Sequence, residues 1–304
     1  MTGPRYDVLV VGGVGVDTVV RVERLPVEAR DSVLVPPVRE YVGHTGNGVA
    51  LGCQALGLAT ALVDVIGDDP FGRLVRDRYA DSGVDFRYTT HPSGTRRAVN
   101  LVDDSGRRMS FYDGRHPAGL RLDPELYQPL LATTRHLHLS IMDFARHLYP
   151  AAAELGLTVS TDLHDWDGAN PYHLDFARQS DLVFLSTAAL GDRVEQTMRD
   201  LLREGRASVV VATAGSAGSL LLVRGENQVH QVPVAGLGLP VVDSNGAGDS
   251  YLAAFLAGYL AGRDWTECAR WGAVAGEYSC QRPGTHTSFV DAATLAGLLG
   301  PQVS

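Results

Sequence analysis

The chain has 304 residues, 45% of them hydrophobic, and its 26 basic and 35 acidic residues give a net charge of −9. This length suits one large α/β domain or two smaller ones with a substantial core. The acidic balance, without a long basic run, argues against nucleic acid as a partner. The apolar run at residues 8–11 is far too short for a signal peptide or a membrane span. The widely spaced Cys53, Cys268 and Cys280 predict buried thiols in a reducing cytoplasm rather than a disulfide or zinc framework.

The chain begins with a predicted buried strand over residues 8–11 that ends in a glycine pair. Gly13 and Gly15 could suggest a dinucleotide-binding fingerprint, but Thr18 stands where the third glycine would be. Residues 19–22 favour more strand rather than the helix that such a fingerprint needs. We therefore do not expect a dinucleotide to bind here.

Two segments, residues 18–42 and 86–115, show the alternation of β-strands and no clear helix. The second contains a predicted hairpin, with strands over 98–102 and 108–112 joined by a turn at 103–106. Two β-rich insertions in a chain that otherwise alternates predict a small sheet apart from the main one.

Helices and strands alternate over most of the remaining chain. We expect helices over residues 49–56, 74–80, 126–132, 150–156, 193–205 and 265–280, and strands over 60–66, 135–141, 157–162, 180–185 and 208–212. Such alternation predicts a parallel sheet covered by helices on both faces.

His136 and His138 fall on one face of the strand predicted over residues 135–141. Two histidines at this spacing can bind a metal on a strand. No acidic or cysteine partner is adjacent in the sequence, so we favour ordinary polar strand residues.

A glycine-rich turn at residues 241–249 is the most informative stretch of the chain. We expect Val241 and Val242 to end a strand and the apolar run at 252–260 to form a buried helix. Glycines in the turn cannot block a ligand, and backbone N–H groups at the start of a helix form an anion site, for which phosphate is the expected guest. Asp249 would repel a phosphate, so a role in taking a proton from an attacking hydroxyl is favoured over that of a helix cap.

Residues 243–249 (Asp-Ser-Asn-Gly-Ala-Gly-Asp), followed by two alanines, resemble the C-terminal signature of the ribokinase-like (PfkB) carbohydrate kinase family. Residues 57–72 resemble its N-terminal signature, and residues 213–218 resemble its phosphate-contacting segment. The resemblance covers essentially the whole chain. It implies a single ribokinase-like α/β domain over residues 1–304, with a central mostly parallel sheet, helices on both faces and a small β-sheet lid formed by the segments 18–42 and 86–115.

The resemblance also implies roles for individual residues. Asp249 would be the catalytic base, with the anion hole formed by Gly246, Ala247 and Gly248. The expected sugar contacts are Asp17, Gly43 and Asn47. The expected nucleotide contacts are Thr213, Gly215, Gly218, Gly276 and Cys280. Asp243 would be a ligand of a monovalent cation such as K⁺.

The implied activity is transfer of the γ-phosphate of ATP, with Mg²⁺, to a hydroxyl of a small sugar, and the implied assembly is a homodimer through the lid. A nucleoside kinase is the alternative within the family, because the lid aromatics Phe111 and Tyr112 could stack on a base. A non-catalytic ligand-binding or regulatory protein is the alternative outside it. That alternative arises because the family's Asn-x-x-Glu pattern, which helps to place magnesium, is replaced here by Ser186 and Ala189.

Overall fold

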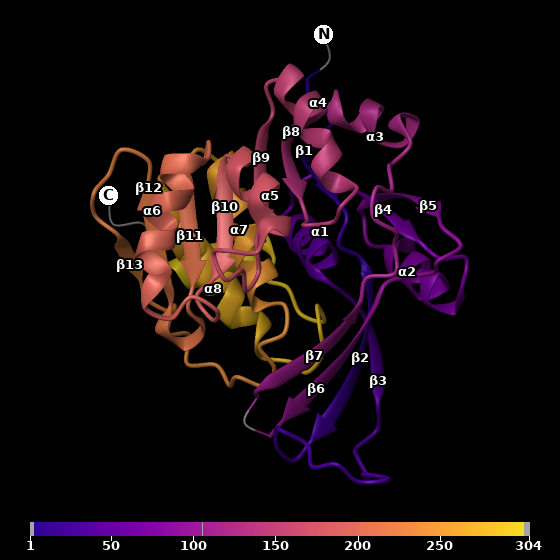
Figure 1. The fold of residues 1–304 in the computed structure, drawn as a ribbon. Coiled ribbons are helices and arrows are strands. Elements are labelled where there is room, and N and C mark those ends of the chain that lie inside the picture. Colours follow the sequence, from indigo (N-terminus) through magenta and orange to yellow (C-terminus); the bar gives the residue numbers. More distant parts are fainter. Residues whose placement is uncertain (1–2, 105, 301–304) are drawn as a thin grey trace.

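A nine-stranded sheet forms the centre of the protein in the computed structural model, which describes residues 3–104 and 106–300 (Figure 1). In spatial order its strands are β13 (His230–Val232), β12 (Ser219–Val223), β11 (Val209–Thr213), β10 (Leu182–Ser186), β9 (Thr158–Asp162), β8 (Thr134–Leu139), β1 (Tyr6–Val11), β4 (Thr60–Ile66) and β5 (Asp85–Thr90). Neighbouring strands run parallel from β11 to β5, whereas β12 is antiparallel to both β11 and β13. The predicted mostly parallel sheet is therefore confirmed.

Helices cover both faces of this sheet, because its strands are apolar on both sides. Val8 and Val10 of β1 belong to one apolar cluster, and Leu9 and Val11 belong to the other. The first cluster is completed by α1 (Thr45–Ala55), α2 (Pro70–Ala80), α7 (Ala247–Leu260), α8 (Trp265–Ser279) and α9 (Ala292–Leu299). The second is completed by α3 (Pro124–Leu131), α4 (Tyr149–Glu154), α5 (Leu174–Gln179) and α6 (Val194–Glu204).

Short 3-10 turns complete the helical elements: η1 (Ala145–Leu148), η2 (Pro171–His173), η3 (Gly191–Arg193) and η4 (Gly215–Ala217). Among the residues described, none of the helices combines the length and the apolar character that crossing a membrane requires.

A smaller four-stranded sheet projects from the end of the large one (Figure 1). Its strands, in spatial order, are β3 (Arg39–Gly43), β2 (Gly15–Val22), β6 (Arg97–Asp103) and β7 (Arg108–Asp113). The pair β6–β7 is the predicted hairpin, with antiparallel register. Ser105, in its predicted turn, lies outside the described residues.

The structure changes the boundaries expected for the smaller sheet. β5, which begins the segment 86–115, pairs in parallel with β4 of the large sheet, so the smaller sheet takes only β6 and β7 from that segment. β5 is an edge strand with half-exposed side chains, and such a strand shows the same alternation as a strand of a solvated small sheet. The first segment in turn starts earlier than expected, because β2 begins at Gly15.

The strand expected to end at Val241 and Val242 is absent, and these two side chains are 72% and 43% exposed. The N–H groups of Val242 and Asp243 donate instead to the carbonyl of Cys280, at 2.8 and 3.1 Å. The segment ahead of α7 is thus held by the end of α8 rather than by a neighbouring strand.

His136 and His138 connect β8 to β9 within the buried interior. Both side chains contact the hydroxyl of Ser160, at 2.8 and 2.9 Å, and His136 Nδ1 lies 2.8 Å from Thr158 Oγ1. Burial lowers the pKa of each imidazole from its ordinary 6.5 to about 3. The two histidines therefore act as uncharged hydrogen-bonding residues of the sheet.

These lowered pKa values predict a pH-dependent stability. Below pH 6.5 the unfolded chain binds protons that the folded chain does not bind until about pH 3, so the free energy of unfolding falls as the pH drops through this window. At pH 5.5 each histidine should lower it by about 1 kcal/mol. Urea unfolding at pH 7.5 and 5.5 measures the loss, and His138→Gln, which cannot titrate there, should reduce it by about 1 kcal/mol. An unchanged loss in the variant would contradict the prediction.

Candidate active site

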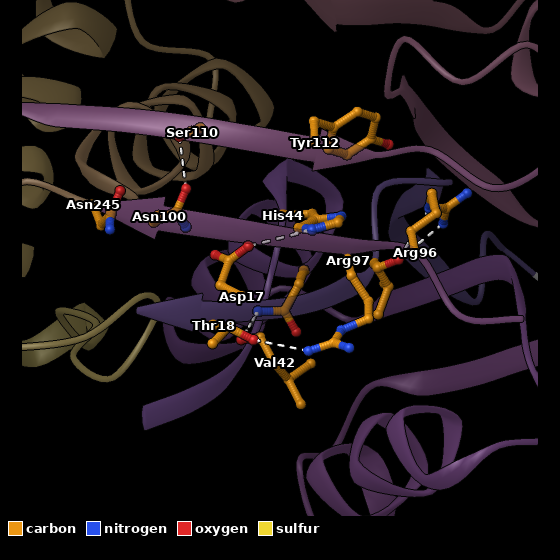
Figure 2. A network of polar contacts seen from close by, with 12 residues as sticks. Asp17, Thr18, Val42, His44, Arg96, Arg97, Asn100, Ser110, Tyr112 and Asn245 are labelled. Atoms are coloured by element: carbon orange, nitrogen blue, oxygen red, sulfur yellow. Dashed lines mark hydrogen bonds and ion pairs between the residues drawn. The ribbon is translucent and has the colours of Figure 1, made fainter. Parts of the chain in front are cut away.

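One face of the smaller sheet carries polar side chains toward the rest of the protein. Side chains alternate along strands, and the register places Asp17, Val102 and Tyr112 on the same face as Arg21 and Asn100. Figure 2 shows Asp17, Asn100 and Tyr112 gathered along this inner face. Asn100 is buried, and its Oδ1 accepts a hydrogen bond of 2.6 Å from Ser110.

Phe111 lies on the opposite, outer face, where it is 53% exposed. Of the two aromatic residues expected to be available for stacking, only Tyr112 therefore faces the site. Its ring lies 5.5 Å from that of His44, centroid to centroid, and the two rings are tilted.

Asp17 is a buried carboxylate at the base of the inner face. His44 Nε2 lies 3.3 Å from its Oδ1 (Figure 2). Burial alone would raise the pKa of Asp17, but the interactions with His44 and, more weakly, with His286 outweigh it, so the pKa lies below its ordinary value. Gly43 makes room for this carboxylate, since a Cβ there would lie 2.3 Å from Asp17 Oδ2. Asp17 is thus an ionised acceptor suited to sugar hydroxyls.

The expected anion site lies at the first turn of α7. Gly246 precedes the helix with φ 80, in the left-handed region that glycine favours. Within the described part of the chain, the N–H groups of Gly248 and Asp249 have no acceptor, and a Cβ at Gly248 would meet no atom within 4 Å. Unpaired N–H groups at an open helix N-terminus attract an anion such as phosphate.

Asp249 is buried beside this turn, with 7% of its surface exposed. Its Oδ2 lies 2.7 Å from His286 Nε2, whereas its Oδ1 has no hydrogen-bond partner among the described residues. Burial raises the pKa of Asp162, at the end of β9, and the charges of Asp249 and Asp165 raise it further. The charges of Asp162 and Asp249 therefore interact.

Both carboxylate oxygens of Asp243 accept hydrogen bonds from other residues of the protein. Its Oδ1 accepts from the N–H of Asn245 at 3.0 Å, and its Oδ2 accepts from the N–H of Gly284 at 3.0 Å and from Arg21 Nη2 at 2.9 Å. Arg108 Nη1 donates to the side-chain oxygen of Asn245. Two arginines of the smaller sheet thus hold the segment that leads into the turn at residues 246–249.

Asn47 reaches the site in a different way from that expected. It is fully buried, and its Nδ2 contacts the carbonyl of Val42 at 3.2 Å and His286 Nδ1 at 2.9 Å, while its Oδ1 accepts from the hydroxyl of Tyr79 at 2.8 Å. Asn47 therefore supports His286 rather than presenting its amide to a sugar. The next residue, Gly48, has to be a glycine, because a Cβ at this position would lie 2.5 Å from the Cβ of Asp249.

The expected nucleotide contacts divide into two groups. Thr213 ends β11 beside Ser186 of β10, and the following Gly215, with φ 55, faces open space. Gly218 has a structural reason for its identity, since its φ is 88 and a Cβ would lie 2.2 Å from the carbonyl of Val232. Contact of these residues with a nucleotide stays a prediction.

Gly276 and Cys280 belong to the end of α8, against the start of α7. A Cβ at Gly276 would lie 3.2 Å from the carbonyl of Ala247, and the carbonyl of Cys280 holds the segment ahead of α7. Burial raises the pKa of the Cys280 thiol. These contacts give both residues a packing role, and their place in an adenine pocket stays a prediction.

No role was predicted from the sequence for His286, Tyr79 or His44. His286 follows the helix predicted over residues 265–280 and belongs to no motif, so its burial beside Asp249 could not be anticipated. The substitution at Ser186 and Ala189 is not compensated by Glu195, which pairs with Arg199 at 2.6 Å on the exposed side of α6. Ala189 itself is exposed.

The chain belongs to the pfkB family of carbohydrate kinases, whose family model matches residues 6–292. It is 46% identical over 290 residues to the acarbose 7(IV)-phosphotransferase of Actinoplanes sp., with 95% of this chain and 97% of the relative covered. The solved structure of the microbiome-derived acarbose kinase Mak1 is 52% identical, with a TM-score of 0.91 and coverage of 98% of this chain and 100% of that one.

The ribokinase of Arabidopsis thaliana, solved with ribose and ATP, has the same fold at 23% identity, with a TM-score of 0.82 over 99% of this chain and 100% of that one. The expected ribokinase-like fold is thus confirmed. The chain is an ATP-dependent carbohydrate kinase that transfers phosphate to a sugar hydroxyl.

Gly248→Ala separates a ligand-binding role of the turn from a structural one. The methyl group meets no atom within 4 Å, and alanine favours a helix over glycine, so stability should stay constant or rise by up to about 1 kcal/mol. The methyl would stand where phosphate is expected, so kcat/KM for ATP should fall about tenfold or more. Thermal melting and steady-state kinetics test both effects. Gly297→Ala in α9, equally free of neighbours, is the control, and equal kinetics in the two variants would refute the assignment.

Proposed function

We propose that Asp249 is the base of the phosphotransfer reaction. The main support for this role is the position of Asp249, a buried carboxylate on the first turn of α7. One of its oxygens is held by His286, and the other has no partner among the described residues. Unpaired backbone N–H groups lie beside it. Oδ1 accepts the proton of the sugar hydroxyl, and the hydroxyl oxygen forms a bond to the γ-phosphorus. The bond from that phosphorus to the bridging oxygen breaks, and ADP leaves. The amides of the turn hold the charge of the transferring group.

We infer that the acceptor is acarbose or a closely related saccharide. The support is the 46% identity to an acarbose phosphotransferase and the 52% identity to an acarbose kinase, each over almost the whole chain. The polar inner face of the smaller sheet, with Asp17, Asn100, Ser110 and Tyr112, offers the acceptors and donors that a hydroxyl-rich ligand needs. A nucleoside would have two aromatic rings of this sheet on the same face, those of Tyr112 and of Tyr41, the register partner of Asp17.

Asp162, at the end of β9, offers a carboxylate to a magnesium ion. Burial and the charge of Asp249 both raise the pKa of the Asp162 carboxyl. Carboxylate oxygens are ligands that suit this hard cation. We infer that Asp162 would help to hold Mg²⁺. Bound with ATP, Mg²⁺ neutralises phosphate charge.

We further infer a single domain in which the smaller sheet is the lid over the sugar. Its outer face carries the exposed side chains of Met109 and Phe111, which supports a homodimer through the lid. Cys53, Cys268 and Cys280 are free and buried, as suits a protein kept in a reducing compartment.

The residues around Asp243 do not fit a monovalent cation, because the Arg21 guanidinium already neutralises this carboxylate at 2.9 Å. We therefore expect replacement of K⁺ by a bulky organic cation to change kcat by less than about twofold. Arg21→Ala leaves the charge of Asp243 buried and unpaired, and should lower kcat about tenfold, with partial recovery in K⁺. Arg24→Ala, which removes an exposed pair with Glu28, is the control. A wild-type enzyme that requires K⁺ would contradict this assignment.

Phosphorylation of acarbose by the wild-type protein and by Asp249→Asn tests the proposed function. ADP release should be seen with ATP, Mg²⁺ and acarbose, and mass spectrometry should show one added phosphate. Asp249→Asn should lower kcat by about 10²–10⁴-fold because the amide cannot accept the proton, while ATP binding by calorimetry stays within about threefold. Asp291→Asn, a helix cap that asparagine can also form, is the matched control.

The acceptor panel should also contain ribose, fructose and common nucleosides. A nucleoside as the best acceptor would replace acarbose in the proposal and leave Asp249 as the base. Full activity of Asp249→Asn with any acceptor would overturn the role of Asp249.

A further inference from the structure

A buried chain of hydrogen bonds lies directly behind Asp249. His286 Nε2 is 2.7 Å from Asp249 Oδ2, His286 Nδ1 is 2.9 Å from Asn47 Nδ2, and Asn47 Oδ1 is 2.8 Å from the hydroxyl of Tyr79. These residues come from α7, the loop after α8, α1 and α2. The His286 side chain is 1% exposed, and that of Asn47 is fully buried. These hydrogen bonds of His286 and Asn47 are therefore shielded from solvent.

The protein partners fix which atoms carry the protons. The carbonyl of Val42 can only accept, so the atom of Asn47 that lies 3.2 Å from it is the amide nitrogen. The second hydrogen of this nitrogen points to His286 Nδ1, which must then be an acceptor. The imidazole proton is consequently on Nε2, and Nε2–H donates to Asp249 Oδ2. Each member of the chain has one compatible role.

The backbone is shaped around this imidazole from several sides. His286 itself has φ 55, a left-handed conformation that costs free energy in a residue with a Cβ. A Cβ at Gly48 would lie 2.3 Å from His286 Nε2, and a Cβ at Gly246 would lie 2.5 Å from its Cδ2. The ring of Phe289 stacks at 6.0 Å on the remaining side. Segments distant in sequence thus fix the imidazole in one position, as expected where a strained backbone conformation serves a function.

We propose that His286 is the positioning residue of the catalytic base, itself oriented by Asn47 and Tyr79. Its Nε2–H donates to Oδ2 of Asp249 and fixes the orientation of the carboxylate, so that Oδ1 points to the acceptor hydroxyl. Asn47 holds the imidazole in the tautomer that can donate. This inference rests on the proposed role of Asp249 as base.

A pair of side chains of equal length separates hydrogen bonding from shape. His286→Gln retains an N–H that can reach Asp249, whereas His286→Met fills a similar volume without a donor. We expect His286→Met to lower kcat about 30-fold or more and to leave KM for ATP and for the acceptor within about threefold. His286→Gln should restore kcat to within about fivefold of wild type. His230→Met is the control, since it removes a histidine paired with Glu226 at 2.6 Å on an edge strand.

The same variants in the Asp249→Asn background test whether His286 acts through Asp249. If it does, His286→Met should lower the residual rate by less than about twofold when position 249 is Asn. Equal losses in His286→Met and His286→Gln, with both proteins folded and binding ATP, would overturn the proposal in favour of a packing role. A His286→Met enzyme with wild-type kcat would overturn it as well. An active Asp249→Asn enzyme would instead reject the base assignment, so the two failures are distinguishable.

Discussion

The close approach of α1 to the first turn of α7 determines the geometry on which the rest of the site depends. Gly48 and Gly246 leave out the side chains that would otherwise collide with Asp249 and His286. The imidazole then fits between the two helices and fixes one carboxylate oxygen, while the N–H groups of Gly248 and Asp249 have no acceptor among the described residues. A polar group buried this deeply is stable only with its partners in place, which Asn47 and Tyr79 supply.

The two sheets contribute different parts of the site. The large sheet and its helices present the anion turn and the acidic residues, whereas the inner face of the smaller sheet presents Asp17 and its polar neighbours. Arg21 and Arg108 connect them by contacting Asp243 and Asn245. The smaller sheet is thereby connected to the segment that leads into the turn at residues 246–249.

The sequence predicted those features whose residues are contiguous. The turn at 246–249 and the alternation of helices and strands were visible because each depends on a short local pattern. His286 was not, because its partners lie 37 and 239 residues away in the chain. For Asn47 the residue was identified, but its contacts with Tyr79 and His286 were not, because these partners lie 32 and 239 residues away in the chain. β5 was placed in the wrong sheet because alternation reports exposure of one face and carries no information about the pairing partner.

A crystal structure of the Asp249→Asn protein with an unhydrolysable ATP analogue, Mg²⁺ and acarbose tests the central claim most directly. The account predicts one acarbose hydroxyl within about 2.6–3.2 Å of the side-chain atom that replaces Oδ1 of Asp249. It also predicts the γ-phosphate against the N–H groups of Gly248 and residue 249, in line with that hydroxyl. A bound acarbose whose nearest hydroxyl lies beyond hydrogen-bonding reach of position 249, with the γ-phosphate away from the turn, would contradict it.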